Sequence, residues 1–144
     1  MEFTVRSARP DDAGELWRLN EAFNGSGEKT AAQMERDLST RINERVFVAQ
    51  CGERLIGFCC CQVKRSFCYE TLTVELTELY VEPYARRQGV AGALLAAMQD
   101  SFLGEPVERF ELLTGDDNAA ARAFYESCGF SLSGEVHYER EIKG

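Results

Sequence analysis

The strongest constraint on the fold is one stretch in which a strand pattern leads directly into a helix pattern. Residues 71–81, TLTVELTELYV, alternate apolar and polar side chains for most of their length, as a strand with one buried face does. Pro83 ends this strand, because proline cannot donate to a sheet ladder. From residue 89 to residue 102 the apolar side chains recur at helical spacing, at Val90, Leu94, Leu95, Met98 and Phe102. The stretch therefore predicts a sheet with helices packed against it.

The other segments continue this mixture. Apolar or alternating runs predict strands at residues 3–8, 45–50, 55–64 and 109–114, and one or two more within residues 131–142. The turn CGER between the second and third runs predicts a β-hairpin. Helical spacing predicts further helices near residues 11–23, 30–43 and 115–129, the last of which ends at Gly129 as a C′ glycine. Asp11 or Asp12 would cap the first of these, and Met34, Leu38 and Ile42 would form the inner face of the second. The fold class is α/β (α+β).

The balance of charge limits the partners. The chain of 144 residues has a net charge of −8, which disfavours nucleic acid because proteins that bind it usually present a basic face. The excess of carboxylates favours cationic partners such as amines. The opening residues MEFTVRSARPDD are charged, so we expect no secretory signal, and no later run is long enough to span a bilayer. We expect a cytoplasmic protein that binds neither nucleic acid nor membrane.

Six cysteines are present, and Cys59, Cys60 and Cys61 are consecutive in an apolar run. This placement is unlike a disulfide framework, and it lacks the spaced pairs of a zinc site. We interpret the cysteines as buried small apolar residues and expect no metal. A thiol-based enzyme that pairs the cysteine run with His137, the only histidine, is an alternative.

The helix start at residue 89 has the features of an anion-binding site. The first N–H groups of a helix have no partner within it, and the helix dipole adds partial positive charge there. Arg86 and Arg87 add full charges, Gln88 adds donors, and Gly89 and Ala91 leave the backbone accessible. Known Gly-rich phosphate loops do not match this segment. A solvated helix start, with arginines that serve solubility, is the alternative interpretation.

Two motifs connect this helix start with a known family. The pattern [RQ]-x-x-G-x-[GA] is met by Arg86, Gly89 and Ala91, after a strand that ends in Leu79, Tyr80 and Val81. The pattern N-x-x-A-x-x-[FL]-Y-x-x-x-G-F is met by Asn118, Ala121, Phe124, Tyr125, Gly129 and Phe130. With both motifs in this order, the chain resembles the GNAT superfamily of N-acetyltransferases. The resemblance implies a single GNAT-like domain over residues 1–144, with a mixed, mostly antiparallel sheet of six to seven strands flanked by about four helices.

The resemblance also implies that acetyl-CoA is the co-substrate and assigns residues to it. The residues that would wrap the CoA pyrophosphate are Arg86, Arg87, Gln88, Gly89, Val90, Ala91 and Gly92. The backbone of Leu79, Tyr80 and Val81 would pair with the pantetheine arm as an added strand does, and a backbone N–H of this strand would bind the oxyanion. Asn118 would contact the cofactor near its sulfur end. Tyr125 would face the sulfur and protonate the leaving thiolate, although a tyrosine packed on the inner face of its helix is the alternative.

Two glutamates are candidates for the base. Leu72, Val74 and Leu76 share one face of the predicted strand, so Glu75 lies on the other face. The alternation breaks after Leu76, which indicates either a β-bulge near Thr77 that re-aims Glu78 or a strand buried on both sides. Several relatives carry a carboxylate base at the position of Glu75, which we prefer slightly, whereas Glu78 is closer to the cofactor-binding residues. Each would act through water, and each is equally explained as a solvated carboxylate.

The resemblance implies an acetyl-CoA-dependent N-acetyltransferase that acts on a primary amine. The acidic balance favours a small cationic amine, such as a polyamine, an aminoglycoside-like amine or an amino-acid derivative. A protein N-terminus or a lysine is the alternative acceptor, and a non-catalytic module that binds or senses CoA is the alternative function. A homodimer is compatible with the resemblance, since many relatives are dimers.

Overall fold

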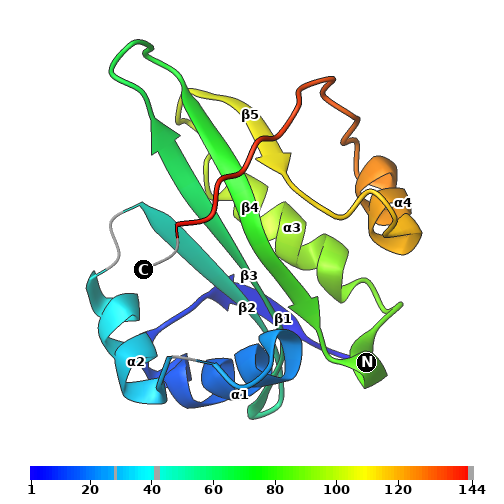
Figure 1. Cartoon of the computed structure of the whole chain (residues 1–144). Coiled ribbons are helices and arrows are strands. Elements are labelled where there is room, and N and C mark those ends of the chain that lie inside the picture. Colours follow the sequence, from blue (N-terminus) through cyan, green and yellow to red (C-terminus); the bar gives the residue numbers. More distant parts are fainter. Residues whose placement is uncertain (28, 41–42, 143–144) are drawn as a thin grey trace. The chain divides into compact units, whose positions relative to one another are not determined.

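The computed structural model describes residues 1–27, 29–40 and 43–142, and the chain divides into two compact units, Met1–Leu113 and Thr114–Gly144 (Figure 1). The strands of the first unit are β1 (Thr4–Ser7), β2 (Glu44–Cys51), β3 (Arg54–Arg65), β4 (Leu72–Val81) and β5 (Val107–Leu112). Its α-helices are α1 (Ala13–Asn24), α2 (Ala31–Thr40) and α3 (Val90–Asp100). The second unit contains α4 (Ala119–Ser127). No helix within the described ranges is long and apolar enough to cross a bilayer.

The five strands of the first unit form one sheet in the order β1-β2-β3-β4-β5. The first three pairings are antiparallel and the β4–β5 pairing is parallel, which confirms the mixed, mostly antiparallel sheet. The predicted hairpin is also confirmed, because β2 and β3 pair directly through the turn at Gly52.

The strand count differs from the prediction of six to seven. The described residues 131–142 contain no strand, although their side chains alternate. Leu132, Val136 and Tyr138 are 82%, 74% and 89% exposed, so the second unit itself does not bury their apolar atoms. Alternation predicts only which side chains share a face, whereas a strand also needs a neighbour for its backbone hydrogen bonds.

Helices cover both faces of the sheet in the first unit. On one face, Leu16 and Leu19 of α1 join a buried cluster with Val48, Phe58 and Tyr80 of the strands. Met34 and Leu38 of α2 pack against this cluster as predicted, whereas Ile42 lies outside the described residues.

On the other face, α3 packs closely on β3. The Sγ of Cys59 donates to the Leu94 carbonyl at 3.7 Å. A Cβ on Gly57 would lie 3.3 Å from Cδ1 of Leu94 and 2.8 Å from the Tyr80 carbonyl oxygen, so the absence of a side chain permits this close approach. The apolar side chains predicted for the inner side of this helix are all buried, namely Val90, Leu94, Leu95, Met98 and Phe102.

The prediction that the cysteines are buried apolar residues is confirmed only in part. All six are free, and Cys59 and Cys61 are buried as expected. Cys68 and Cys128 are exposed, so the interpretation as buried apolar residues is wrong for these two. Cys68 lies in the β3–β4 loop and Cys128 follows α4, and neither position faces a core.

Asp12 precedes α1, but its role differs from the predicted cap. Its carboxylate makes no capping bond to α1. Instead it binds the guanidinium of Arg6 through both oxygens, at 2.8 and 2.9 Å, and accepts from the backbone N–H of Arg9 at 2.7 Å. Burial by itself would raise the pKa of Asp12, but the hydrogen bonds from Arg6 and Arg9 outweigh it and lower the pKa below its ordinary value of 3.8.

Asp12→Asn is therefore expected to lower the free energy of unfolding at pH 7 by about 1.5–3 kcal/mol, the usual size of a hydrogen bond to a charged group. Because the folded-state pKa is depressed, this stabilisation is present above the unfolded pKa and is lost as the pH falls through the folded pKa. The difference in the free energy of unfolding between wild type and Asp12→Asn, measured by urea denaturation, should become smaller below pH 3.8. Asp11→Asn is the control, since Asp11 is exposed; an equal loss in that variant would contradict the prediction.

Candidate functional site

A β-bulge in β4 organises one side of the site. Glu78 lies opposite Cys60 of β3 and Leu76 lies opposite Cys61, so Thr77 is the extra residue between them. Of the two explanations that the sequence left open for the break in alternation, the structure has the β-bulge, and the Thr77 hydroxyl donates to the Cys60 carbonyl at 3.2 Å. Without the extra residue, Glu75 and Glu78 would lie on opposite faces of the sheet. With it, both lie on the face that carries Phe58 and Tyr80.

The two glutamates have different surroundings on this face. Glu75 is held in an ion pair by Lys64, whose Nζ lies 3.0 Å from Oε1 of Glu75 and 3.9 Å from Oε1 of Glu111. Glu78 makes no ion pair or side-chain hydrogen bond with any residue that the structure describes. Its burial raises the pKa of its carboxyl group above 4.5, and the negative charge of Glu44 raises it further.

The edge of β4 opens beyond the bulge. The pairing of β4 with β5 ends at Leu76 and Leu112, whereas β4 continues to Val81. Along this continuation β3 pairs with one edge of β4, and no strand of the described sheet pairs with the other edge. An exposed strand edge of this kind can accept an extended ligand as an added strand. Leu79, Tyr80 and Val81, predicted to bind the cofactor, lie on this continuation.

The start of α3 leaves backbone N–H groups uncapped. Gly89 occupies the cap position with φ of 84°, in the left-handed region that favours glycine, and it has no side chain to cap the helix. The N–H of Ala93 bonds to the Gly89 carbonyl at 3.0 Å, which closes the first helical turn. A Cβ at Gly89 or Gly92 would point into open space. The geometry fits an anion bound by backbone N–H groups.

In the loop before α3, the side chains of Arg86, Arg87 and Gln88 are exposed, and they differ in the groups that they contact. The Nε of Arg86 donates to the Val81 carbonyl at 2.9 Å, and its guanidinium carbon lies 5.9 Å from the centre of the Tyr80 ring. Arg86 is thus directed back toward the strand. Gln88 donates to the Tyr84 carbonyl at 3.3 Å, and Arg87 has an unusual positive φ of 62°. The structure therefore places Arg86 next to the end of β4, whereas Gln88 contacts Tyr84 within the loop.

An ion-pair network supports the end of β4, and the sequence analysis missed it. Arg18 of α1 binds Glu15 at 2.8 Å and also reaches Oε1 of Glu82, the residue after β4, at 2.8 Å. Arg18 further donates to the Leu55 carbonyl at 3.0 Å, and the Glu82 N–H donates to the Ile56 carbonyl at 2.8 Å. No local motif joins Arg18 to Glu82, because they are 64 residues apart.

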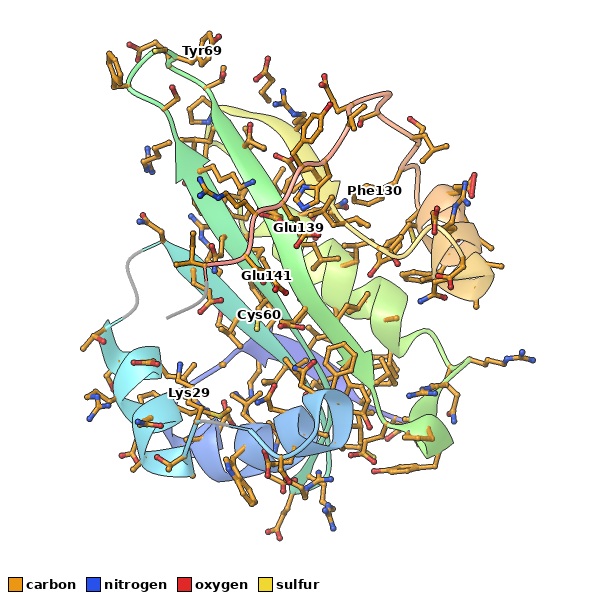
Figure 2. All side chains as sticks on the ribbon, in the orientation of Figure 1. Lys29, Cys60, Tyr69, Phe130, Glu139 and Glu141 are labelled. Atoms are coloured by element: carbon orange, nitrogen blue, oxygen red, sulfur yellow. The ribbon has the colours of Figure 1, made fainter. Side chains whose placement is uncertain are left out.

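The second motif lies in the second unit. Asn118 caps α4 by accepting from the Ala121 N–H at 3.1 Å, and Gly129 ends the helix with φ of 95°, as predicted for a C′ glycine. The half-buried Tyr125 contacts the rings of Phe124 and Phe130 at centroid distances of 5.2 and 5.9 Å; Figure 2 labels Phe130 beyond the helix. The roles of Asn118 and Tyr125 toward a cofactor stay predictions.

The cysteine run does not have the properties of a nucleophile. Burial raises the pKa of Cys59 to about 12 and that of Cys61 to about 11. Burial, with Glu44 as the next cause, also raises the pKa of Cys60 well above 9.0. Neutral thiols are poor nucleophiles, which argues against a thiol-based enzyme. Among the described residues, no group of three or more His, Cys, Asp or Glu side chains could hold a metal ion.

The sequence model of the acetyltransferase (GNAT) family matches residues 14–130. The ribosomal protein bS18-alanine N-acetyltransferase of Escherichia coli (strain K12) is 33% identical over 94 residues, which are 62% of this chain and 64% of that protein. The match thus spans less than two thirds of the relative.

Solved structures share the fold at low sequence identity. An aminoglycoside acetyltransferase from an uncultured soil metagenomic sample, in complex with sisomicin, has a TM-score of 0.84 and 20% identity, over 98% of this chain and 97% of that chain. AAC(6')-Iy, in complex with the bisubstrate analog CoA-S-monomethyl-acetylneamine, has a TM-score of 0.83 and 20% identity, over 99% of this chain and 100% of that chain. Since the family model covers most of the sequence, including both motifs and the bulged strand, the chain belongs to the acetyltransferase (GNAT) family.

Proposed function

We propose that this protein is an acetyl-CoA-dependent N-acetyltransferase that acts on a primary amine. The observation that carries the proposal is the junction of two binding surfaces, because the open edge of β4 ends at Val81 just before the uncapped start of α3. An extended arm that ends in a diphosphate fits both surfaces, since the strand edge offers ladder hydrogen bonds and the helix start offers N–H donors. Acetyl-CoA has this chemistry, and the fold relative AAC(6')-Iy binds a CoA-containing analog.

The proposed binding residues divide by role. The backbone of Leu79, Tyr80 and Val81 pairs with the pantetheine arm. The pyrophosphate is held by residues of the loop and helix start, namely Arg86, Arg87, Gln88, Gly89, Val90, Ala91 and Gly92. Among these, Arg86 holds the loop against the Val81 carbonyl, while the exposed Arg87 supplies charge.

The proposed reaction is a direct transfer between the two substrates. The amine nitrogen attacks the thioester carbonyl, so that a C–N bond forms and the C–S bond breaks. A backbone N–H of β4 stabilises the oxyanion of the tetrahedral intermediate. The proton lost by the amine passes through water to a glutamate, and Tyr125 donates a proton to the departing thiolate.

Glu78 fits the role of base better than Glu75. A base must be free to accept a proton, and Glu75 is engaged by Lys64 at 3.0 Å. Glu78 is half-buried, its pKa is raised by burial and by Glu44, and it lies closer along β4 to the proposed pantetheine site. A raised pKa makes a carboxylate a stronger base near neutral pH. We therefore assign the base to Glu78 and reverse the slight preference for Glu75 that the sequence suggested.

The acceptor is proposed to be a small cationic amine. The net charge of −8 favours attraction of cations, and the face of the sheet that carries Glu78 also carries Glu44, Glu75 and Glu111. Relatives with this fold include aminoglycoside acetyltransferases. A protein N-terminus is the second candidate, because the relative at 33% identity acts on an alanine of ribosomal protein bS18.

Calorimetry with three ligands tests the cofactor, and an acceptor screen tests the reaction. Acetyl-CoA and CoA should bind in the micromolar range, whereas adenosine 3′,5′-bisphosphate, which lacks the pantetheine arm, should bind much more weakly. Equal binding of all three ligands would contradict the strand-edge site, and no binding would refute the proposed function. Polyamines, aminoglycosides and a peptide with an N-terminal alanine then separate the two acceptor classes. Tight CoA binding with no transfer to any amine would favour the non-catalytic module.

Tyr125→Phe tests the proposed acid. We expect kcat to fall roughly tenfold, less than the usual 10²–10⁴ for an acid–base group, because a thiolate is a good leaving group. The Kd for CoA should stay nearly unchanged, since the ring and its contacts with Phe124 and Phe130 are retained. Tyr69→Phe in the exposed β3–β4 loop, labelled in Figure 2, is the control. An unchanged kcat in Tyr125→Phe would show that this tyrosine serves packing only.

A further inference from the structure

We infer that Glu44 is a positioning residue that acts on the proposed transfer through Glu78, because the sheet brings the two carboxylates to one face with no cation between them among the described residues. The catalytic meaning of this inference rests on the proposed function, but the coupling between the two carboxylates does not. Glu44 is the first residue of β2, 34 positions before Glu78, and belongs to neither family motif.

The sheet register brings the two glutamates to the same face. Glu44 lies opposite Gln62 of β3, and Val46 lies opposite Cys60. Cys60 in turn lies opposite Glu78 on β4. Side chains opposite one another share a face, so Glu44 and Glu78 occupy neighbouring rows of one face, with only β3 between their strands. This arrangement depends on the bulge at Thr77, because a regular β4 would direct Glu78 to the face covered by α3.

No cation of the described residues compensates the two carboxylates. Both carboxylates are half-buried, and neither is in an ion pair or side-chain hydrogen bond with any residue of the described ranges. Cys60, labelled on β3 in Figure 2, lies between their strands, and both charges contribute to the raised pKa of its thiol. A cysteine side chain carries no positive charge in either protonation state, so Cys60 cannot balance them. Partial burial strengthens the interaction of the like charges relative to water.

The other described charged groups of the neighbouring strands that face this region are paired. On β4 and β5, Glu75 and Glu111 share Lys64, and the exposed Arg109 is paired with Glu108 at 3.3 Å.

The helices on this side of the sheet, α1 and α2, direct apolar rather than charged side chains toward it. Toward the sheet, α1 and α2 contribute apolar side chains, namely Leu16, Leu19, Met34 and Leu38. Their charged residues are engaged elsewhere or exposed. Glu15 and Arg18 bind one another and the end of β4, Asp37 pairs with Lys29, and Glu35 and Arg36 are exposed. Among the described residues, Glu44 is thus the charge that acts on Glu78, second to burial as a cause of its raised pKa.

The coupling is measured directly by carbon-13 NMR titration of the glutamate side-chain carboxyls in the protein without ligands. The Glu78 signal is assigned by its disappearance in Glu78→Gln. In Glu44→Gln the Glu78 titration should move to lower pH, because a like charge that disfavours ionisation has been removed. Glu44→Asp keeps the negative charge, so in this variant the Glu78 signal should titrate at a pH close to that in the wild type. Glu111→Gln removes an equal charge from the same face and should leave the Glu78 titration nearly unchanged.

The kinetic arm separates this inference from the proposed function. In Glu44→Gln the acidic limb of kcat/KM should move to lower pH, and kcat should fall roughly two- to fivefold, because catalysis by a base follows its strength. An unmoved Glu78 titration in Glu44→Gln overturns the inference, even where the wild type transfers acetyl groups. A moved titration in a protein that acetylates no amine supports the coupling and refutes the proposed function. A loss of activity that Glu44→Asp does not rescue, with the titration unmoved, assigns Glu44 a purely structural role.

Discussion

Glu78→Gln is expected to lower kcat/KM for acetyl transfer by about 10²–10⁴-fold, the usual contribution of a general base. Glutamine keeps the size of the side chain but cannot accept the proton that the amine must lose. In the wild type, kcat/KM should rise with pH as Glu78 loses its proton, with an acidic limb above pH 4.5 because burial and Glu44 raise its pKa. In Glu78→Gln that limb should disappear, as measured by steady-state kinetics between pH 5 and 9.

The matched control is Glu75→Gln, which removes a carboxylate from the same face of the same strand. Because Glu75 is engaged by Lys64, we expect kcat/KM to change only slightly. A large loss in Glu75→Gln, with Glu78→Gln active, would assign the base to Glu75 instead. Stability gives a second check, since a carboxyl group whose folded pKa is raised loses its stabilising contribution as the pH rises through that value. Glu78→Gln should therefore be no less stable than wild type at pH 7 in thermal denaturation, so its inactivity cannot be attributed to unfolding.

Gly89→Val is expected to raise the Kd for CoA by about a hundredfold or more, as calorimetry would measure. Two effects act together. Valine is strained at φ of 84°, by about 1–3 kcal/mol, which shifts the loop away from its binding conformation. Its side chain would also occupy the open space at the helix start that the diphosphate is proposed to fill. Loss of one or two hydrogen bonds to a charged group, at about 1.5–3 kcal/mol each, accounts for a change of this size.

Gly52→Val separates strain from ligand contact. Gly52 has a positive φ of 60° in the β2–β3 turn, and a Cβ there would also meet open space. Gly52→Val should lower the free energy of unfolding by about as much as Gly89→Val does. It should leave the Kd for CoA within a few-fold of wild type. If both variants lost affinity equally, general destabilisation would explain the loss. Tight CoA binding by a folded Gly89→Val would refute the proposed phosphate site.

The sequence by itself determined the local elements of this protein. The helical spacing from Val90 to Phe102, the hairpin around Gly52 and the C′ position of Gly129 were all readable, because each depends on residues a few positions apart. The interruption of the two-residue alternation was also a local signal, but it left open whether β4 carries a bulge or is buried on both sides. The family followed from two short motifs whose glycines and polar residues stand at fixed spacings.

The prediction of strands in residues 131–142 shows the limit of such patterns. Alternation describes which side chains could share a face, but the backbone partner that makes a strand lies elsewhere in the chain. Asp12 shows the same limit on a smaller scale. Its position before a helix suggested a cap. Instead, the guanidinium of Arg6 on β1 donates hydrogen bonds to both oxygens of its carboxylate.

Only the tertiary structure decided how the charged groups are paired. The proposed preference for Glu78 rests on the ion pair of Glu75 with Lys64 of β3, and the raised pKa of Glu78 comes first from its burial and then from the charge of Glu44 on β2. These contacts join strands through a register that includes the bulge, and a shift of one residue would move a glutamate to the opposite face. Electrostatic surroundings depend on distance and burial in space, which no local pattern encodes, so the sequence could nominate both glutamates but only the folded sheet distinguishes them.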